Sequence, residues 1–193
     1  MPATTANPTF ADRLWPAGAG NRVLRAILLA LAGSLLLWAS AKVQVPFYPV
    51  PMTLQTAVVL LIGVAYGWRL GAATVLLYLA EGAIGLPVFA GTPERGIGLA
   101  YMVGPTGGYL VGFVVAAAIA GWVAERSRHW LTTTLGLLAG LAAIHVLGAS
   151  WLATLIGPAK AVSLGVLPFL LGDLVKVALV AAAAEAGLAR PRA

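Results

Sequence analysis

The sequence predicts an all-α integral membrane protein with six transmembrane helices. Apolar residues make up 61% of the 193 positions and the four charged types only 9%, whereas a soluble domain carries about a quarter charged residues. One core cannot bury so much apolar surface, but a bilayer can solvate side chains that face outward. The second observation is a series of apolar blocks at 22–41, 53–67, 69–86, 99–124, 130–156 and 161–187.

The lengths of these blocks support six spans. A helix needs about 20 apolar residues to cross the bilayer core, or about 17 at the short end, and four of the blocks meet this comfortably. The second and third are short and are separated only by Gly67-Trp68-Arg69. Because Arg69 would be costly at the bilayer centre, we expect two short helices joined by a tight cytoplasmic turn. One long re-entrant element is the alternative.

Basic residues between the blocks predict the orientation. With six spans, one side carries eight arginines and the other side carries Lys42, Arg95 and Lys160. The positive-inside rule therefore places both termini in the cytoplasm. The eight are Arg13, Arg22, Arg25, Arg69, Arg126, Arg128, Arg190 and Arg192.

Three regions follow from this pattern. Residues 1–21 are polar and contain three prolines, so we expect a flexible cytoplasmic tail, followed by a membrane domain at 22–188 and a short cytoplasmic tail at 189–193. The arginines near residue 22 and the run Ala39-Ser40-Ala41 also resemble a cleavable signal peptide. Five further apolar segments argue against that alternative.

Charge and composition also exclude some functions. The net charge is +6, but the basic residues lie between apolar blocks and not on one aromatic-rich face. We therefore expect no nucleic-acid partner. The chain has no cysteine and two histidines, which excludes thiolate metal sites and leaves little for any metal cluster. We expect no metal and no cofactor.

Asp173 and Lys176 form the main candidate site, because they lie in the middle of the last apolar block. Each charge at that depth costs about 2.5–3.5 kcal/mol on insertion scales. Their i, i+3 spacing puts them on one helical face, where they can pair or contact one ligand. Ionisable residues inside a membrane are by default functional candidates, and an internal salt bridge between helices is the alternative. A proton relay would need further groups, and only Glu81 and His145 lie at similar depth; we expect His145 to be a hydrogen-bonded structural residue.

Two loops supply further candidates. Pro46, Pro49 and Pro51 disfavour helix, so we expect an extended outer loop, which packs on protein or lines a cavity. In this loop Tyr48 can cover a ligand, and Thr53 and Gln55 can make polar contacts; a rigid interfacial loop is the alternative. Further candidates lie between residues 85 and 113. Arg95 can meet an anionic group or pair with Glu94, and the glycines around Tyr109 permit close backbone approach.

The first block carries Ala26, Ala30 and Ser34 at intervals of four residues. Such stripes of small residues allow helices to pack closely in membranes. The stripe therefore predicts either packing within this chain or docking to another membrane subunit.

Several motifs occur in order along the chain: the proline-rich loop ending in Val-Pro-Met-Thr-Leu-Gln55, then Gly85-Leu-Pro-Val-Phe89, Gly104-Pro-Thr-Gly-Gly-Tyr109 and Gly-Asp173-Leu-Val-Lys176. Together they resemble the BioY family, the biotin-specific substrate-binding (S) components of energy-coupling factor (ECF) vitamin transporters. The resemblance covers about residues 42 to 176.

The resemblance implies the ECF S-component fold in the cytoplasmic membrane of a bacterium, with a biotin cavity near the outer face. It implies that Asp173 and Lys176 contact biotin. We expect Gln55, Thr53, Tyr48, Glu81 and Tyr109 as further contacts, and Arg95, which lies in a variable part of the pattern, as the partner of the carboxylate. It also implies that the Ala26/Ala30/Ser34 stripe docks the ECF transmembrane coupling subunit.

Energy would come from partner ATPase subunits, because the chain contains no Walker motif. An autonomous proton-coupled or facilitative carrier is the alternative. An enzyme is disfavoured, since no nucleophile–base or paired-acid constellation is present at helical spacing.

Overall fold

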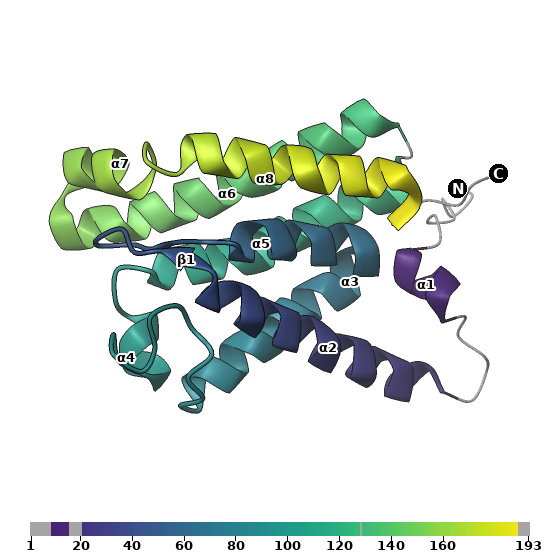
Figure 1. The fold of residues 1–193 in the computed structure, drawn as a ribbon, viewed down its shortest axis with the longest axis horizontal. Helices are drawn as coiled ribbons and strands as arrows, with labels where there is room; N and C mark the ends of the chain where they lie inside the picture. Colours follow the sequence, from purple (N-terminus) through teal and green to yellow (C-terminus); the bar gives the residue numbers. More distant parts are fainter. Residues whose placement is uncertain (1–8, 16–20, 128, 189–193) are drawn as a thin grey trace, which may run out of the picture.

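The computed structural model describes residues 9–15, 21–127 and 129–188, without the side chains of residues 13, 14 and 188. Within these ranges the chain is helical apart from one two-stranded sheet (Figure 1). The elements are α1 (Phe10–Leu14), α2 (Arg22–Lys42), β1 (Gln44–Val45), β2 (Met52–Thr53), α3 (Gln55–Ala83), α4 (Gly98–Met102), α5 (Gly107–Arg126), α6 (Trp130–Ile156), α7 (Pro158–Gly165), α8 (Leu170–Ala183) and the π-helical turn η1 (Ala184–Leu188).

The element α3 is two helices that fold back on each other at Gly67. Gly67 has φ 79° and ψ 171°, which belongs to a region of backbone space open essentially to glycine alone. The amide Nε2 of Gln55 donates to the hydroxyl of Tyr78 at 2.8 Å, although a continuous helix would separate these residues by about 34 Å at 1.5 Å per residue. The structure therefore has a tight turn between the second and third apolar blocks and not one straight element.

Two of the expected single helices are broken. The block at 99–124 divides into α4 and α5, with the break at residues 103–106, where Gly104 and Pro105 disfavour helix. The last block divides into α7 and α8, which meet at a bend of 52°. Pro168 lies in that break, and it lacks the amide that a continuing helix would need.

The polar N-terminal segment also contains structure that the sequence analysis did not expect. Thr9 and Asp12 form a reciprocal capping box that begins α1, and Arg25 of α2 pairs with Asp12 at 2.9 Å. Although partial burial opposes it, hydrogen bonds from Thr9 and Arg25 hold the pKa of the Asp12 carboxyl below its usual value. Residues 1–8, 16–20 and 189–193 lie outside the described residues.

The expected extended loop is confirmed as a β-hairpin, in which Gln44 pairs with Thr53 and Val45 with Met52. This hairpin, α4 and α7 lie at one end of the molecule (Figure 1). The start of α2, α1 and the end of α8 lie at the opposite end (Figure 1). The Gly67 turn lies there too, because a Cβ on Gly67 would be 3.0 Å from Thr9, the residue that caps α1. The helices between them run roughly along the long axis.

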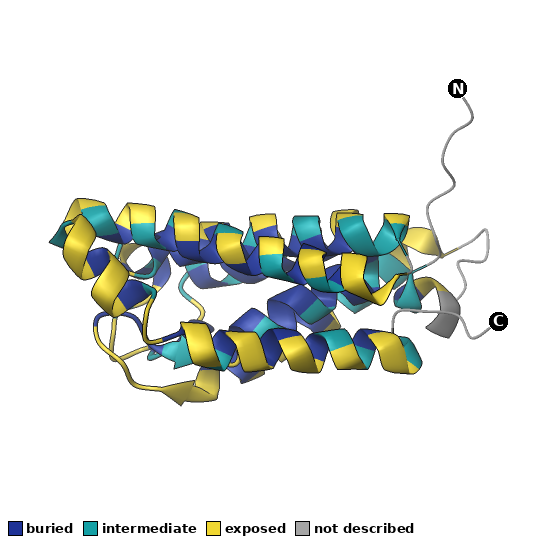
Figure 2. Cartoon of the chain, turned by 90° about the horizontal axis from the view of Figure 1, so that it is seen from above, coloured by how far each residue is buried: buried dark blue, intermediate teal, exposed yellow. Residues whose placement is uncertain are grey.

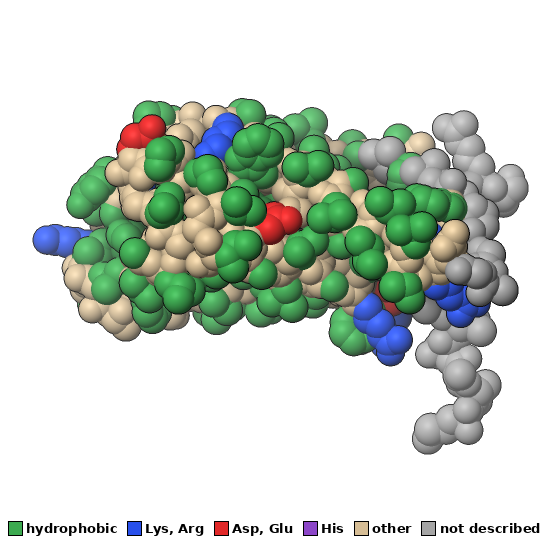
Figure 3. Space-filling model, turned by 90° about the horizontal axis from the view of Figure 1, so that it is seen from below, with side chains coloured by type: hydrophobic (Ala, Val, Ile, Leu, Met, Phe, Trp, Pro, Cys, Tyr) green, Lys and Arg blue, Asp and Glu red, His purple; other side chains and the backbone are tan. Residues whose placement is uncertain are grey.

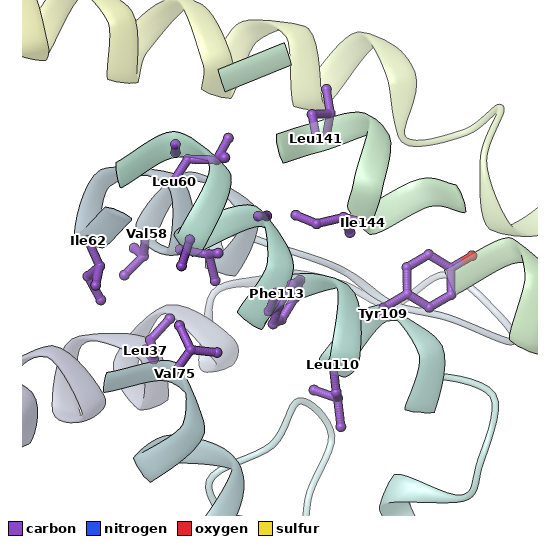
Figure 4. Packing of buried hydrophobic residues seen from close by; sticks show 14 of the residues in the cluster. Leu37, Val58, Leu60, Ile62, Val75, Tyr109, Leu110, Phe113, Leu141 and Ile144 are labelled. Atoms are coloured by element: carbon purple, nitrogen blue, oxygen red, sulfur yellow. The ribbon is translucent and has the colours of Figure 1, made fainter. Parts of the chain in front are cut away.

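Glycines allow the helices to approach closely. A Cβ on Gly112 of α5 would lie 2.8 Å from the Cα of Ile144 on α6, and one on Gly63 would meet the backbone of Ala117. Apolar side chains from α2, α3, α5 and α6 fill the interior (Figure 4). The expected close approach around Gly112 is thus made within the chain.

The outer surface carries many large apolar side chains. Exposed residues lie mainly on the outward faces of the helices (Figure 2), and hydrophobic side chains dominate the face in Figure 3. Leu35, Leu171 and Leu179 are 60%, 77% and 62% exposed, which water would disfavour and lipid tolerates. In the described residues, four helices are long and apolar enough to cross a membrane, or five if α7 and α8 form one bent span.

Candidate substrate-binding site

A cavity lies at the end of the molecule that carries the β-hairpin, between the hairpin and α3, α5, α6 and α8. Polar and apolar side chains share its wall, which suits a small molecule that is mostly apolar and has a few polar groups. The lining residues are Val50, Pro51, Met52, Thr53, Gln55, Thr56, Ala90, Tyr101, Thr106, Tyr109, Leu110, Phe113, Ile144, His145, Phe169, Asp173 and Lys176.

Three charged or titratable side chains meet in this wall. Asp173 Oδ1 accepts from Lys176 Nζ at 2.7 Å, and Asp173 Oδ2 lies 3.0 Å from His145 Nε2. All three are buried, with 3% exposure for Asp173 and 9% for each of the other two. Asp173 also lies in the first turn of α8, where the helix dipole favours a negative charge. The cluster thus keeps a carboxylate and an ammonium group beside an apolar cavity.

A second polar network links the hairpin to α3. Gln55 is 3% exposed and its Nε2 donates to Tyr78, whose hydroxyl donates to the carbonyl of Val88 at 2.9 Å. The hydroxyl of Thr53 accepts from the amide of Gln55 at 3.2 Å. These bonds hold Gln55 and Thr53 in the cavity wall, so the structure brings both sequence candidates together with Asp173 and Lys176.

Aromatic side chains complete the wall. Tyr109 of α5 donates to the carbonyl of Gly165 at 2.7 Å and so ties α5 to α7. Tyr101 of α4 donates to the carbonyl of Ala90 at 2.9 Å. Burial raises the pKa of the Tyr101 phenol, so that it stays a neutral donor. The ring of Phe169 lies 6.0 Å from that of Phe47 and 6.4 Å from that of His145, next to the charged cluster.

Three other sequence candidates lie outside the cavity lining. Tyr48 is 83% exposed. Arg95 donates to the carbonyls of Pro49 and Phe47 at 3.4 and 3.5 Å, so it braces the hairpin loop from the side. Glu81 accepts a hydrogen bond from Ser34 and joins α3 to α2.

The small-residue stripe of α2 faces partly inward. Ser34 is 2% exposed and bonded to Glu81, and a Cβ on the neighbouring Gly33 would collide with Thr74 of α3. Ala26 and Ala30 are half-buried. Ser34 is therefore engaged in packing within the chain, the alternative that the sequence left open.

Several lining residues were not anticipated as site residues, above all His145. A signal existed, because a buried carboxylate requires donors and a histidine in a neighbouring apolar helix can supply one. Thr56, Phe113 and Phe169 carry no such signal, since an apolar or hydroxyl side chain in a membrane helix is usual. Among the described residues, no three metal-binding side chains are grouped to hold a metal ion.

The fold and the cavity together indicate a multi-pass helical membrane protein with a cavity between its helices. Its sequence identifies it more closely. Residues 9–192 match the BioY family, and the chain belongs to that family.

Relatives with assigned names are similar in sequence to this chain over most of its length. The chain is 43% identical over 145 residues to the probable biotin transporter BioY of Pyrococcus horikoshii, covering 75% of this chain and 85% of the relative. It is 36% identical over 159 residues to the biotin transporter BioY of Thermotoga maritima, covering 82% and 92%.

One solved structure has the same fold. It is the S component for biotin from an ECF-type ABC transporter, with a TM-score of 0.77 and 24% sequence identity over 88% of this chain and 94% of the other. The similarity supports the ECF S-component fold that the sequence motifs predicted.

Proposed function

We propose that this chain binds biotin and serves as the S component of an ECF-type uptake system. The observation that carries the proposal is the buried Asp173–Lys176 pair in the wall of the cavity. A ureido ring presents adjacent N–H and C=O groups. Lys176 can donate to the oxygen and the carboxylate of Asp173 can accept from an N–H, while the aromatic wall packs the thiophane ring.

The names of the relatives supply the ligand. The space now open to small molecules is about 50 Å³, room for only a few waters. Biotin is larger, so the cavity must widen when biotin binds. Arg95 donates to the carbonyls of Pro49 and Phe47 in the hairpin loop beside the cavity, and from there it can pair with the carboxylate of biotin.

The proposal includes six membrane spans: α2, the two halves of α3, α5, α6 and the bent α7–α8 pair. Both termini would then lie in the cytoplasm and the cavity near the outer face. Lys42 and Arg95 lie at the cavity end through bonds to residues 47–49 and 87–92, whereas Arg25 lies at the end that carries α1. This distribution fits the positive-inside rule. The half-buried Ala26 and Ala30 remain available for docking the coupling subunit.

Biotin binding to the purified protein tests the proposal. Asp173→Asn and Lys176→Ala should each weaken binding about 10- to 100-fold, because each removes a hydrogen bond that involves a charged group. Glu94→Gln and Lys160→Ala are matched controls, since both side chains are exposed and outside the cavity, and they should bind like the parent. Absence of binding by the parent would contradict the function, and unchanged affinity in both site variants would contradict the site.

Uptake measurements separate the S component from the alternative, an autonomous proton-coupled carrier. In cells without coupling subunits, an S component that depends on them should accumulate no labelled biotin. Accumulation that is abolished by a protonophore would favour the carrier.

A further inference from the structure

The charged cluster contains one atom whose hydrogen-bonding capacity is unused. Of the buried side-chain nitrogen and oxygen atoms in the described residues, only Arg25 Nε and His145 Nδ1 lack a partner. Arg25 is near α1, at the opposite end from the cavity, whereas His145 lines the cavity. Buried polar atoms are nearly always hydrogen-bonded, so an unpartnered one in a cavity wall indicates a missing ligand.

The contacts of Asp173 show whether His145 Nδ1 is a donor or an acceptor. Asp173 is ion-paired with Lys176 at 2.7 Å, so its carboxylate is an acceptor at both oxygens. His145 Nε2, 3.0 Å from Asp173 Oδ2, must therefore carry the hydrogen. In a neutral imidazole the other nitrogen is then an acceptor. His145 Nδ1 is then a buried acceptor without a partner, in a residue that lines the cavity.

Several other polar groups in the wall already have partners. Each carboxylate oxygen of Asp173 has one partner and keeps a further lone pair that can accept from a ligand, and the hydroxyls of Tyr101 and Tyr109 donate to backbone carbonyls. Gln55 is bonded to Tyr78. Lys176 uses one of its three hydrogens on Asp173. His145 Nδ1 and the remaining hydrogens of Lys176 therefore supply an unused acceptor and unused donors in residues that line the cavity.

We infer that His145 is a substrate-recognition residue whose Nδ1 accepts a hydrogen bond from an N–H group of the ligand. This inference rests on the proposed function, in which the ureido ring of biotin supplies the N–H. A ligand with adjacent N–H and C=O groups then bridges His145 Nδ1 and Lys176 Nζ. Asp173 orients the imidazole and pairs with the ammonium, and its carboxylate can accept from the second N–H of the ureido ring.

The experiment measures biotin affinity for the purified parent, His145→Gln and His129→Gln. The side-chain amide of glutamine can still donate to Asp173, but it offers no acceptor at the position of Nδ1. We expect His145→Gln to bind about 5- to 100-fold more weakly than the parent. His129 is exposed at the start of the same helix, so His129→Gln should behave like the parent. Thermal unfolding shows that the variants are folded.

The outcomes separate the inference from the proposed function. No biotin binding by the parent would contradict the function. If the parent binds and His145→Gln matches its affinity, His145 only holds Asp173 in place and the inference is wrong. If His145→Gln fails to fold, the parent decides alone: it should bind a biotin methylated at both ureido nitrogens more weakly than biotin, and equal affinity would overturn the inference. Biotin methylated on its ureido nitrogens lacks the N–H group. Its affinities for the parent and for His145→Gln should therefore differ less than those of biotin do.

Discussion

Asp173 connects two helices and the cavity through a few atoms. Its oxygens contact Lys176 one helical turn along α8 and His145 on α6. Removing charges from water is costly, and the attraction between buried partners offsets this cost only when both are present. Removing any one of Asp173, Lys176 and His145 should therefore leave a buried partner unpaired and destabilise the protein.

This dependence predicts a non-additive stability change. Asp173→Leu should lower the free energy of unfolding by about 3–5 kcal/mol, because it leaves Lys176 buried without a carboxylate. The double variant Asp173→Leu with Lys176→Met should recover most of that loss, since it replaces both charges by apolar groups. Thermal or denaturant unfolding in detergent without biotin measures both changes. A double variant as unstable as the sum of the single variants would show that the pair is not coupled.

At the scale of elements, the apolar blocks do not all become single straight helices. Gly67 reverses α3, the residues after Met102 separate α4 from α5, and Pro168 lies in the bend between α7 and α8. The latter two breaks lie beside the cavity, where they bring Tyr101 and Phe169 into its wall. Non-helical backbone at such depth is tolerated where it lines a cavity, which fits the position of these breaks.

The turn in α3 predicts how adding one methyl group at Gly67 affects the stability of the protein. Gly67→Ala should destabilise the protein, because φ 79° is strained for alanine and the new Cβ would collide with Oε1 of Glu125. That oxygen accepts from the amide of Trp68 at 3.0 Å, so moving it would release a bond at the turn. We expect a loss of about 2–4 kcal/mol, combining backbone strain with the lost bond.

Gly85→Ala is the matched control for this prediction. Gly85 has φ 99° but nothing within 4 Å of an added Cβ, so only backbone strain applies. Unfolding of the two variants in detergent provides the comparison. Equal losses would show that the collision at Glu125 does not contribute.

At the scale of the whole molecule, the charges at the two ends predict the orientation in the membrane. The end with α1 and the Gly67 turn carries Arg25 and Arg69, and the cavity end carries Lys42 and Arg95. An outward-facing cavity would allow the chain to capture its ligand from outside the cell. This arrangement requires Asn21 and Ser127 on the inner side and Glu94 on the outer side.

The absence of native cysteine makes this orientation easy to test. Single variants Asn21→Cys, Ser127→Cys and Glu94→Cys can be treated with a membrane-impermeant thiol reagent in intact cells. Glu94→Cys should be labelled directly, and the other two only after the membrane is permeabilised. Labelling of Ser127→Cys in intact cells would contradict the six-span arrangement, and the reverse pattern for all three would invert the orientation.

The sequence alone was enough to predict a helical membrane protein, the turn near Gly67 and the importance of Asp173 and Lys176. These conclusions depend on local quantities: the length of an apolar run, the cost of a charge within it and the spacing of two residues on one helix. Only the tertiary structure showed that His145 lies against Asp173 although 28 residues separate them, and that Tyr48 and Glu81 lie outside the cavity. The reason is physical, because apolar periodicity defines which segments enter the membrane, whereas the packing of side chains between helices determines which of their faces meet.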